Sequence, residues 1–132
     1  MQNDAGAPIR VLFADDNAEI FTLVVGAFQR AGFAVDAASR GDDALSLYRA
    51  ARADRQRYDF VLLDVAMPGL NGYEVAQCIR VDDSATLIAF FTAFDEPMAA
   101  VRAQVVHACG VWSKPADLLR LPQMIEEVLN AT

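Results

Sequence analysis

The chain has 132 residues, of which 55% are hydrophobic and 22% are charged, and its formal net charge is −7 at pH 7. This length is typical of one domain with a buried core, and the high apolar content excludes an intrinsically disordered chain. Because phosphate binding needs a basic surface, the excess of 18 Asp and Glu over 11 Lys and Arg argues against direct nucleic-acid binding.

Short apolar runs alternate with segments of helical periodicity along the chain. Residues 1–8 combine polar residues with Gly and Pro, and they predict a flexible lead-in to one domain at residues 9–130. In chain order, the expected elements are a strand at 9–14, a helix at 19–31, a strand at 33–37, a helix at 42–53, a strand at 60–63, a helix at 73–80, a strand at 87–91, a helix at 97–108, a strand at 111–112 and a helix at 121–129.

The expected strands are almost continuously apolar, which is typical of a parallel sheet buried on both faces. Strands that alternate with helices predict an α/β fold in which helices cover both sides of the sheet. In a doubly wound sheet of five strands with the order 2-1-3-4-5, the order reverses between the first and third strands. Ligands bind at such a point, outside the carboxyl ends of the strands.

Polar side chains lie at these carboxyl ends. Asp15 and Asp16 follow the first strand, Asp64 follows the third, Thr92 follows the fourth and Lys114 follows the fifth. Because neighbouring strands are about 4.8 Å apart, the three carboxylates are expected to meet where the strand order reverses.

Three carboxylates so close together repel one another unless a cation lies among them. Mg²⁺ is the natural candidate, because it prefers oxygen ligands and is often held by one or two carboxylates together with phosphate oxygens. Lys114 adds a positive charge and Thr92 a hydroxyl group at the same edge. A nucleophilic carboxylate, a divalent ion, a lysine and a hydroxyl group are the groups that phosphoryl transfer needs.

Four motifs occur in order at these strand ends: LFADDN, LLDVAMPGLNGYE, FFTAF and WSKP. With them the chain resembles, over about residues 8–130, the receiver domain of two-component response regulators, which has a flavodoxin-like fold. The resemblance implies that Asp64 accepts a phosphoryl group from a phosphohistidine on a partner. It also implies that Asp15, Asp16, Asp64 and the backbone carbonyl of Ala66 hold Mg²⁺.

The same resemblance gives roles to the remaining residues at the strand ends. Thr92 would bond the phosphoryl oxygens, Lys114 would neutralise them, and the peptide bond between Lys114 and Pro115 would be cis. Phosphorylation would shift an equilibrium between two conformations, and slow hydrolysis would reverse it. The chain would then be a switch that loses its phosphoryl group slowly, and not a turnover enzyme.

The chain departs from the usual receiver pattern at Val111, where family members carry Tyr or Phe three positions before the lysine. Trp112 lies on the opposite face of the strand, so we interpret it as a packing residue. His107 is expected to be a surface or packing histidine near the end of the fourth helix. A further hypothesis is that Phe94, two residues after Thr92, covers the pocket and alters dephosphorylation.

Two alternatives to a receiver switch stay open. A phosphatase of the haloacid dehalogenase type needs a second Asp two residues after its nucleophile, and Ala66 occupies that position. A pseudo-receiver that only binds partners would be expected to lack an acidic residue, the acceptor or the lysine, and all are present here. Only the departure at Val111 favours the pseudo-receiver.

The expected partners are a sensor histidine kinase or phosphotransfer protein and a downstream protein. The downstream protein would bind the fourth helix, the fifth strand and the fifth helix. Because no further domain follows residue 130, we expect a stand-alone receiver or an intermediate of a phosphorelay. A run of roughly 18 apolar residues and a signal peptide are both missing, and Cys78 and Cys109 lack metal-ligand spacing, so we expect a cytoplasmic protein with free thiols.

Overall fold

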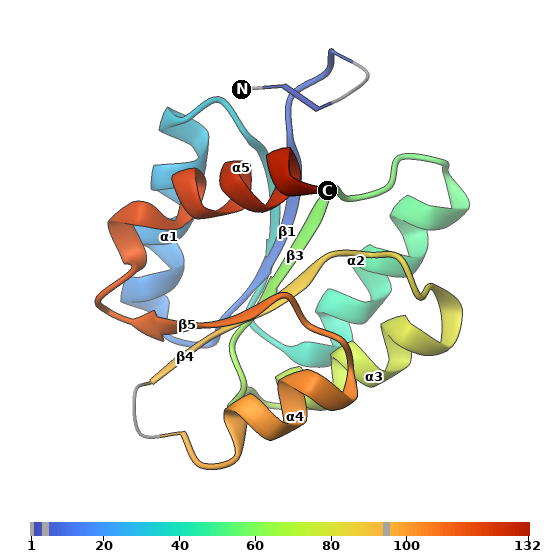
Figure 1. The fold of residues 1–132 in the computed structure, drawn as a ribbon, viewed down its shortest axis with the longest axis vertical. Coiled ribbons are helices and arrows are strands. Elements are labelled where there is room, and N and C mark those ends of the chain that lie inside the picture. The colour runs from blue at the N-terminus through green and yellow to red at the C-terminus, as the bar shows by residue number, and fades with distance from the viewer. Residues whose placement is uncertain (1, 4–5, 94–95) are drawn as a thin grey trace.

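The sequence folds into a twisted parallel sheet between two layers of helices, as seen in a computed structural model (Figure 1). The structure describes residues 2–3, 6–93 and 96–132. Its elements are β1 (Arg10–Ala14), α1 (Ala18–Arg30), β2 (Ala34–Ala38), α2 (Gly41–Ala53), β3 (Phe60–Leu63), α3 (Gly72–Asp82), β4 (Ile88–Ala93), α4 (Ala99–Val105), β5 (Gly110–Lys114), η1 (Leu118–Arg120) and α5 (Leu121–Ala131). The predicted α/β architecture is confirmed, with the strand order β2-β1-β3-β4-β5.

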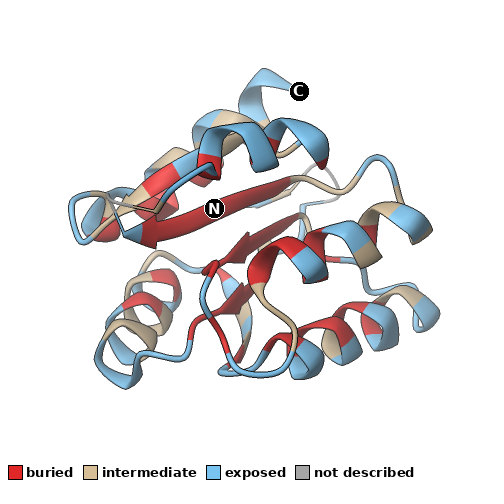
Figure 2. Ribbon diagram, turned by 90° about the horizontal axis from the view of Figure 1, so that it is seen from below, coloured by how far each residue is buried: buried red, intermediate tan, exposed pale blue. Residues whose placement is uncertain are grey.

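Two buried clusters fill the space between the sheet and its helices. On one face, α2, α3 and α4 pack against the sheet through residues such as Leu45, Ile79 and Ala103. On the other face, α1 and α5 pack through residues such as Phe28 and Ile125. Figure 2 shows buried residues along the strands and on the inward sides of the helices. Burial on both faces explains why the strands are apolar throughout rather than alternating.

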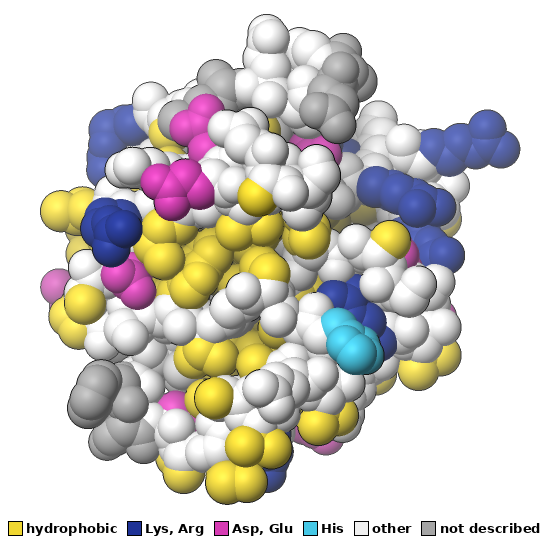
Figure 3. Space-filling view, viewed as in Figure 1, with side chains coloured by type: hydrophobic (Ala, Val, Ile, Leu, Met, Phe, Trp, Pro, Cys, Tyr) yellow, Lys and Arg dark blue, Asp and Glu magenta, His cyan; other side chains and the backbone are white. Residues whose placement is uncertain are grey.

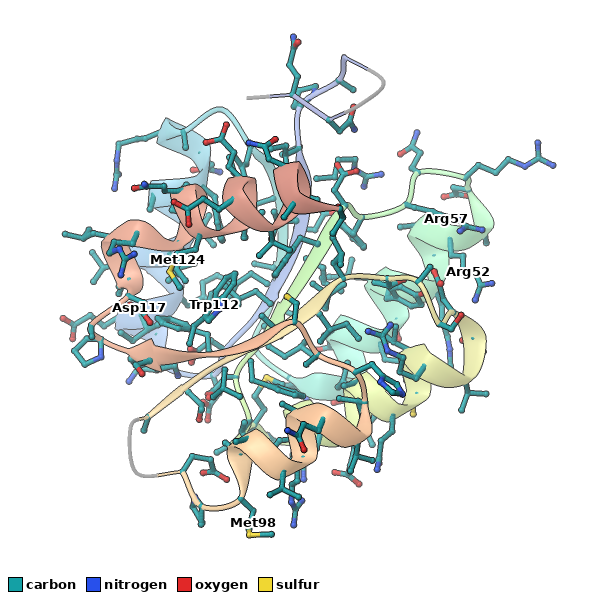
Figure 4. All side chains as sticks on the ribbon, in the orientation of Figure 1. Arg52, Arg57, Met98, Trp112, Asp117 and Met124 are labelled. Atoms are coloured by element: carbon teal, nitrogen blue, oxygen red, sulfur yellow. The ribbon has the colours of Figure 1, made fainter. Side chains whose placement is uncertain are left out.

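Trp112 belongs to the second of these clusters. Its ring stacks on Phe60 with the ring centroids 5.4 Å apart, and its side chain lies on the same side of the sheet as Met124 of α5 (Figure 4). The prediction that Trp112 is a packing residue is confirmed. Val111 has the opposite orientation and is 37% exposed.

The predicted extent of the fifth strand and the fourth helix was wrong. Strand β5 runs to Lys114 because its pairing with β4 continues past the apolar residues, through the pair of Thr92 with Ser113. Helix α4 has seven residues, since Met98 before it and His107 after it both have left-handed backbone angles. His107 is exposed, as expected of a surface histidine, and lies beyond the helix. Phe94 lies outside the described residues.

Asparagine caps begin the two helices that follow the acidic strand ends. The Asn17 side chain accepts a hydrogen bond from the N–H group of Ile20, at the start of α1. Asn71 and Glu74 form a reciprocal capping box at the start of α3. Such caps satisfy the free N–H groups of the first turn, so they fix where the preceding loops end.

No helix in the described ranges combines the length and the apolar character needed to cross a membrane. Cys78 and Cys109 are free cysteines. At the start of the chain, Gln2 and Pro8 form an isolated antiparallel bridge, while the flexibility of residues 1–8 stays a prediction.

Candidate functional site

Two aspartates lie side by side where β1 and β3 end. Ala14 and Leu63 are paired in the sheet, and Asp15 and Asp64 follow them directly. The N–H group of Asp64 donates to the carbonyl oxygen of Ala14 at 2.9 Å, which continues the sheet pairing by one residue. Asp15 is fully buried and Asp64 is 5% exposed. The pairing of the two strands therefore places both carboxylates side by side and almost completely buried from solvent.

Asp16 completes a group of three carboxylates. Asp15, Asp16 and Asp64 each offer one oxygen, and these three atoms lie within 4.8 Å of one another. Asp16 is exposed, so the group opens to solvent on one side. The predicted convergence of the three aspartates is what the structure shows.

The oxygens of Asp15 have different surroundings. Its Oδ1 atom accepts a hydrogen bond from the N–H group of Asn17 at 2.9 Å. Its Oδ2 atom is buried and forms an ion pair with Lys114. No other group in the described part of the chain donates a hydrogen bond to this oxygen. A buried oxygen with spare capacity, next to two further carboxylates, fits a hard cation such as Mg²⁺, which binds oxygen ligands and keeps some of its waters.

Lys114 reaches these carboxylates from the edge strand on the other side of β4. Its Nζ atom lies 2.6 Å from Oδ2 of Asp15 and 3.1 Å from Oδ2 of Asp64. On the way it passes the ring of Phe91 in β4, with Nζ 5.8 Å from the ring centroid. The Lys114 side chain is 15% exposed, so both ion pairs lie largely out of water, where charges interact more strongly than at the surface.

A short turn after β5 holds Lys114 in place. The peptide bond between Lys114 and Pro115 is cis, as expected. The carboxylate of Asp117 accepts a hydrogen bond from the N–H group of Ser113 at 2.9 Å, and the N–H group of Asp117 donates to the carbonyl oxygen of Ser113. Figure 4 shows Asp117 at this end of β5. Sequence reasoning missed Asp117, although an Asp within four residues of a strand end is a common turn acceptor.

The pKa of Asp64 reflects these surroundings. Burial and, to a lesser extent, the negative charge of Asp15 raise it from 3.8 to about 6, although the Lys114 ammonium opposes both effects. Burial penalises the ionised form because the carboxylate loses its hydration. A second positive charge in the group would therefore favour the ionised Asp64.

The two remaining predicted residues are Thr92 and Ala66. Thr92 is 4% exposed and lies near the end of β4, between β3 and β5. Among the described residues, its hydroxyl group makes no hydrogen bond to Asp64 or Lys114. Ala66 is exposed in the loop between β3 and α3. The structure therefore brings together Asp15, Asp16, Asp64 and Lys114. Thr92 is paired in the sheet with Ser113, which precedes Lys114, and Ala66 follows Asp64 by two residues in the chain.

Known proteins match both the sequence and the fold. A family model described as the response regulator receiver domain matches residues 11–126. The transcriptional regulatory protein TrcR of Mycobacterium tuberculosis is 32% identical over 125 residues, which are 95% of this chain and 47% of TrcR. The sporulation initiation phosphotransferase F of Bacillus subtilis is 26% identical over 120 residues, which are 91% of this chain and 93% of that protein.

Among solved structures, a chain of the CheX-CheY-BeF3-Mg complex from Borrelia burgdorferi superposes with a TM-score of 0.83. It is 25% identical, and the match covers 95% of this chain and 92% of that chain. This chain spans about half the length of TrcR and of several other curated relatives that it matches.

Proposed function

We propose, on the premise that this chain belongs to the response regulator receiver domain family, that Asp64 is its phosphoacceptor. Receiver domains are signalling switches of two-component systems and not turnover enzymes. One observation carries the proposal. A nearly buried carboxylate at the end of a central strand lies within reach of two other carboxylates and 3.1 Å from a lysine ammonium. A purely structural ion pair would need one carboxylate and not three.

The proposed reaction transfers a phosphoryl group from a partner's phosphohistidine. A carboxylate oxygen of Asp64 forms a bond to phosphorus, and the bond between phosphorus and the imidazole nitrogen breaks. The electron pair of that bond stays on the nitrogen, so the chain gains one acyl phosphate and the partner regains its histidine. Hydrolysis of the acyl phosphate by water later returns Asp64 and releases inorganic phosphate. Histidine kinases and phosphotransfer proteins are the donors of this family.

The carboxylates of Asp15, Asp16 and Asp64, with the carbonyl of Ala66, would hold Mg²⁺, which when bound offsets the charge of the carboxylates and of the phosphoryl oxygens. That the Borrelia burgdorferi complex contains BeF3 and Mg²⁺ supports a metal site in this fold. In the proposal, Asp15 and Asp16 bind and orient Mg²⁺, and only Asp64 forms a bond to phosphorus.

Lys114 and Thr92 would respond to the new phosphoryl group. The Lys114 ammonium already contacts Asp64, so it can pair with phosphoryl oxygens attached there. The Thr92 hydroxyl would turn toward the same oxygens and donate a hydrogen bond. Because Thr92 lies within β4, this step would displace the end of β4 and shift an equilibrium between two conformations.

The downstream target would bind the face formed by α4, β5 and α5. Hydrophobic side chains gather on this face in Figure 3, and the large apolar residues exposed on or next to α4 and β5 are Met98, Val101, Val105 and Val111. Apolar surface that a partner can cover is typical of interaction sites. That the protein acts without further domains stays a prediction, because the chain spans about half the length of TrcR. Its location in the cytoplasm also stays a prediction.

A mass measurement tests the proposal. The chain is incubated with Mg²⁺ and a small acyl phosphate, and its intact mass is recorded over time. We expect a gain of one phosphoryl group in the wild type and in Asp54→Asn, whose carboxylate is exposed and remote, but none in Asp64→Asn. An equal gain in Asp64→Asn would refute the assignment of the acceptor. No gain in the wild type would favour the pseudo-receiver.

A further inference from the structure

The first residue of α2 lies against the loop that follows Asp64. The N–H group of Gly41 donates to the carbonyl oxygen of Pro68 at 3.2 Å. A Cβ atom on Gly41 would overlap the carbonyl oxygen of Leu70 and lie 2.6 Å from its carbonyl carbon. Both are backbone atoms and cannot rotate away. A larger residue at position 41 would therefore have to displace the loop.

A second contact brings the same loop to the next residue of α2. Gly69 has a φ of +71°, which glycine adopts without strain. A Cβ atom at this position would overlap Oδ1 of Asp42 and lie 3.0 Å from Nη2 of Arg40. Arg40 and Asp42 form an ion pair of 3.3 Å over this part of the loop. The loop and the start of α2 are therefore in close contact at Gly41, Asp42 and Gly69.

The ends of the loop are held separately. The N–H group of Gly72, the first residue of α3, donates to the carbonyl oxygen of Val65 at 2.8 Å. A Cβ atom on Gly72 would overlap the carbonyl oxygen of Asp64. Ala66 lies between these fixed points, beside the buried Met67. Its backbone position is thus set by α2 on one side and by α3 on the other.

We infer that Gly41 is a positioning residue for metal binding, because it lets the loop approach α2 closely enough to fix the backbone at Ala66. The inference rests on the proposed function, which gives the Ala66 carbonyl to Mg²⁺. Gly41 and Asp42 lie outside the carboxylate group of Asp15, Asp16 and Asp64 and act only through the loop. Groups that orient ligands typically change metal affinity by tenfold or more when they are altered.

Calorimetric titration with Mg²⁺ tests the inference on the whole chain. We expect Gly41→Ala to weaken Mg²⁺ binding by about tenfold. Gly26→Ala is the matched control, because a Cβ atom there would meet only the flexible end of Arg30 in α1, 3.0 Å away. Ile125→Val is a second control that lowers stability in α5, far from the loop, and it is expected to bind Mg²⁺ as the wild type does. Urea unfolding of each variant reports stability separately from affinity.

The outcomes separate this inference from the proposed function. Equal affinity in Gly41→Ala and the wild type overturns the inference alone. Equal loss in Gly41→Ala and Ile125→Val also overturns it, because the effect would then follow stability. A wild-type chain that binds no Mg²⁺ overturns the proposed metal site, and the inference with it.

A second pair of variants decides the question if Gly41→Ala does not fold. Gly69→Ala places a methyl group against a movable side-chain oxygen of Asp42, and the backbone strain that alanine adds at a φ of +71° is the same whether or not Asp42 is present. We expect it to weaken Mg²⁺ binding. The same substitution in an Asp42→Ala background is expected to weaken binding less, because the crowding oxygen is gone. If Gly69→Ala lowers Mg²⁺ affinity by the same factor in both backgrounds, the contact between the loop and α2 does not influence metal binding.

Discussion

Burial of Asp64 beside Asp15 predicts that Asp64→Asn stabilises the chain at neutral pH when Mg²⁺ is removed. The fold raises the pKa of Asp64 from 3.8 to about 6, so the folded chain holds this proton more tightly than the unfolded chain does. Below pH 3.8 both states carry the proton and Asp64 costs nothing. As pH rises from 3.8 to the folded-state pKa of about 6, the unfolded chain loses this proton first and the free energy of unfolding falls. Above the folded-state pKa the loss is complete.

The size of the effect follows from the same shift. Each pKa unit corresponds to about 1.4 kcal/mol, so a rise of roughly two units costs about 3 kcal/mol at pH 7. Asparagine resembles the neutral acid in shape and avoids this cost. Lys114 keeps its ion pair with Asp15 at 2.6 Å, so the substitution does not leave the ammonium without a partner. We therefore expect Asp64→Asn to gain about 3 kcal/mol at pH 7 and almost nothing near pH 4.

Urea unfolding with a chelator present, at several pH values between 4 and 8, measures this difference. Asp54→Asn is the control, because its exposed carboxylate should change the free energy of unfolding by less than about 0.5 kcal/mol. Adding Mg²⁺ should narrow the gap, since an ion that binds the folded wild type stabilises it. If Asp64→Asn is no more stable than the wild type at pH 7, or if its advantage does not depend on pH, the reasoning from burial is refuted.

Three further substitutions test the ion pairs and the core. Lys114→Met leaves two nearly buried carboxylates without a counter-charge, so it is expected to cost about 3 kcal/mol at pH 8 and less at pH 5, where protonation relieves Asp64. Urea unfolding at both pH values measures this, and an equal loss at both would contradict it. Trp112→Ala is expected to cost about 3 kcal/mol, because it empties a stacked core position, while Val111→Ala on the exposed face costs less than about 1 kcal/mol. Thermal or urea unfolding compares them, and similar losses would argue against the packing role.

The sequence predicted the sheet and most of its helices because local patterns carry that information. Strand β3 was predicted at its observed bounds, since four apolar residues end at a charged one. Strand β5 was predicted too short, because only Val111 and Trp112 are apolar there. Its last residues join the sheet by pairing with β4, a partner that hydrophobicity does not reveal. Helix α4 was predicted too long, because the helical pattern of the sequence continues beyond it. The helix itself is bounded by left-handed backbone angles at Met98 and His107.

The sequence by itself determined which residues stand at the carboxyl ends of the strands, and therefore that Asp15, Asp16, Asp64 and Lys114 meet. The alternation of strands and helices, together with a parallel order, leaves the chain few other arrangements. Only the tertiary structure decided that Lys114 pairs with both buried aspartates, that the pKa of Asp64 is raised, and that Gly41 admits the loop after Asp64. Charge interaction, burial and steric fit depend on distances between residues far apart in the chain, and no local pattern encodes those distances.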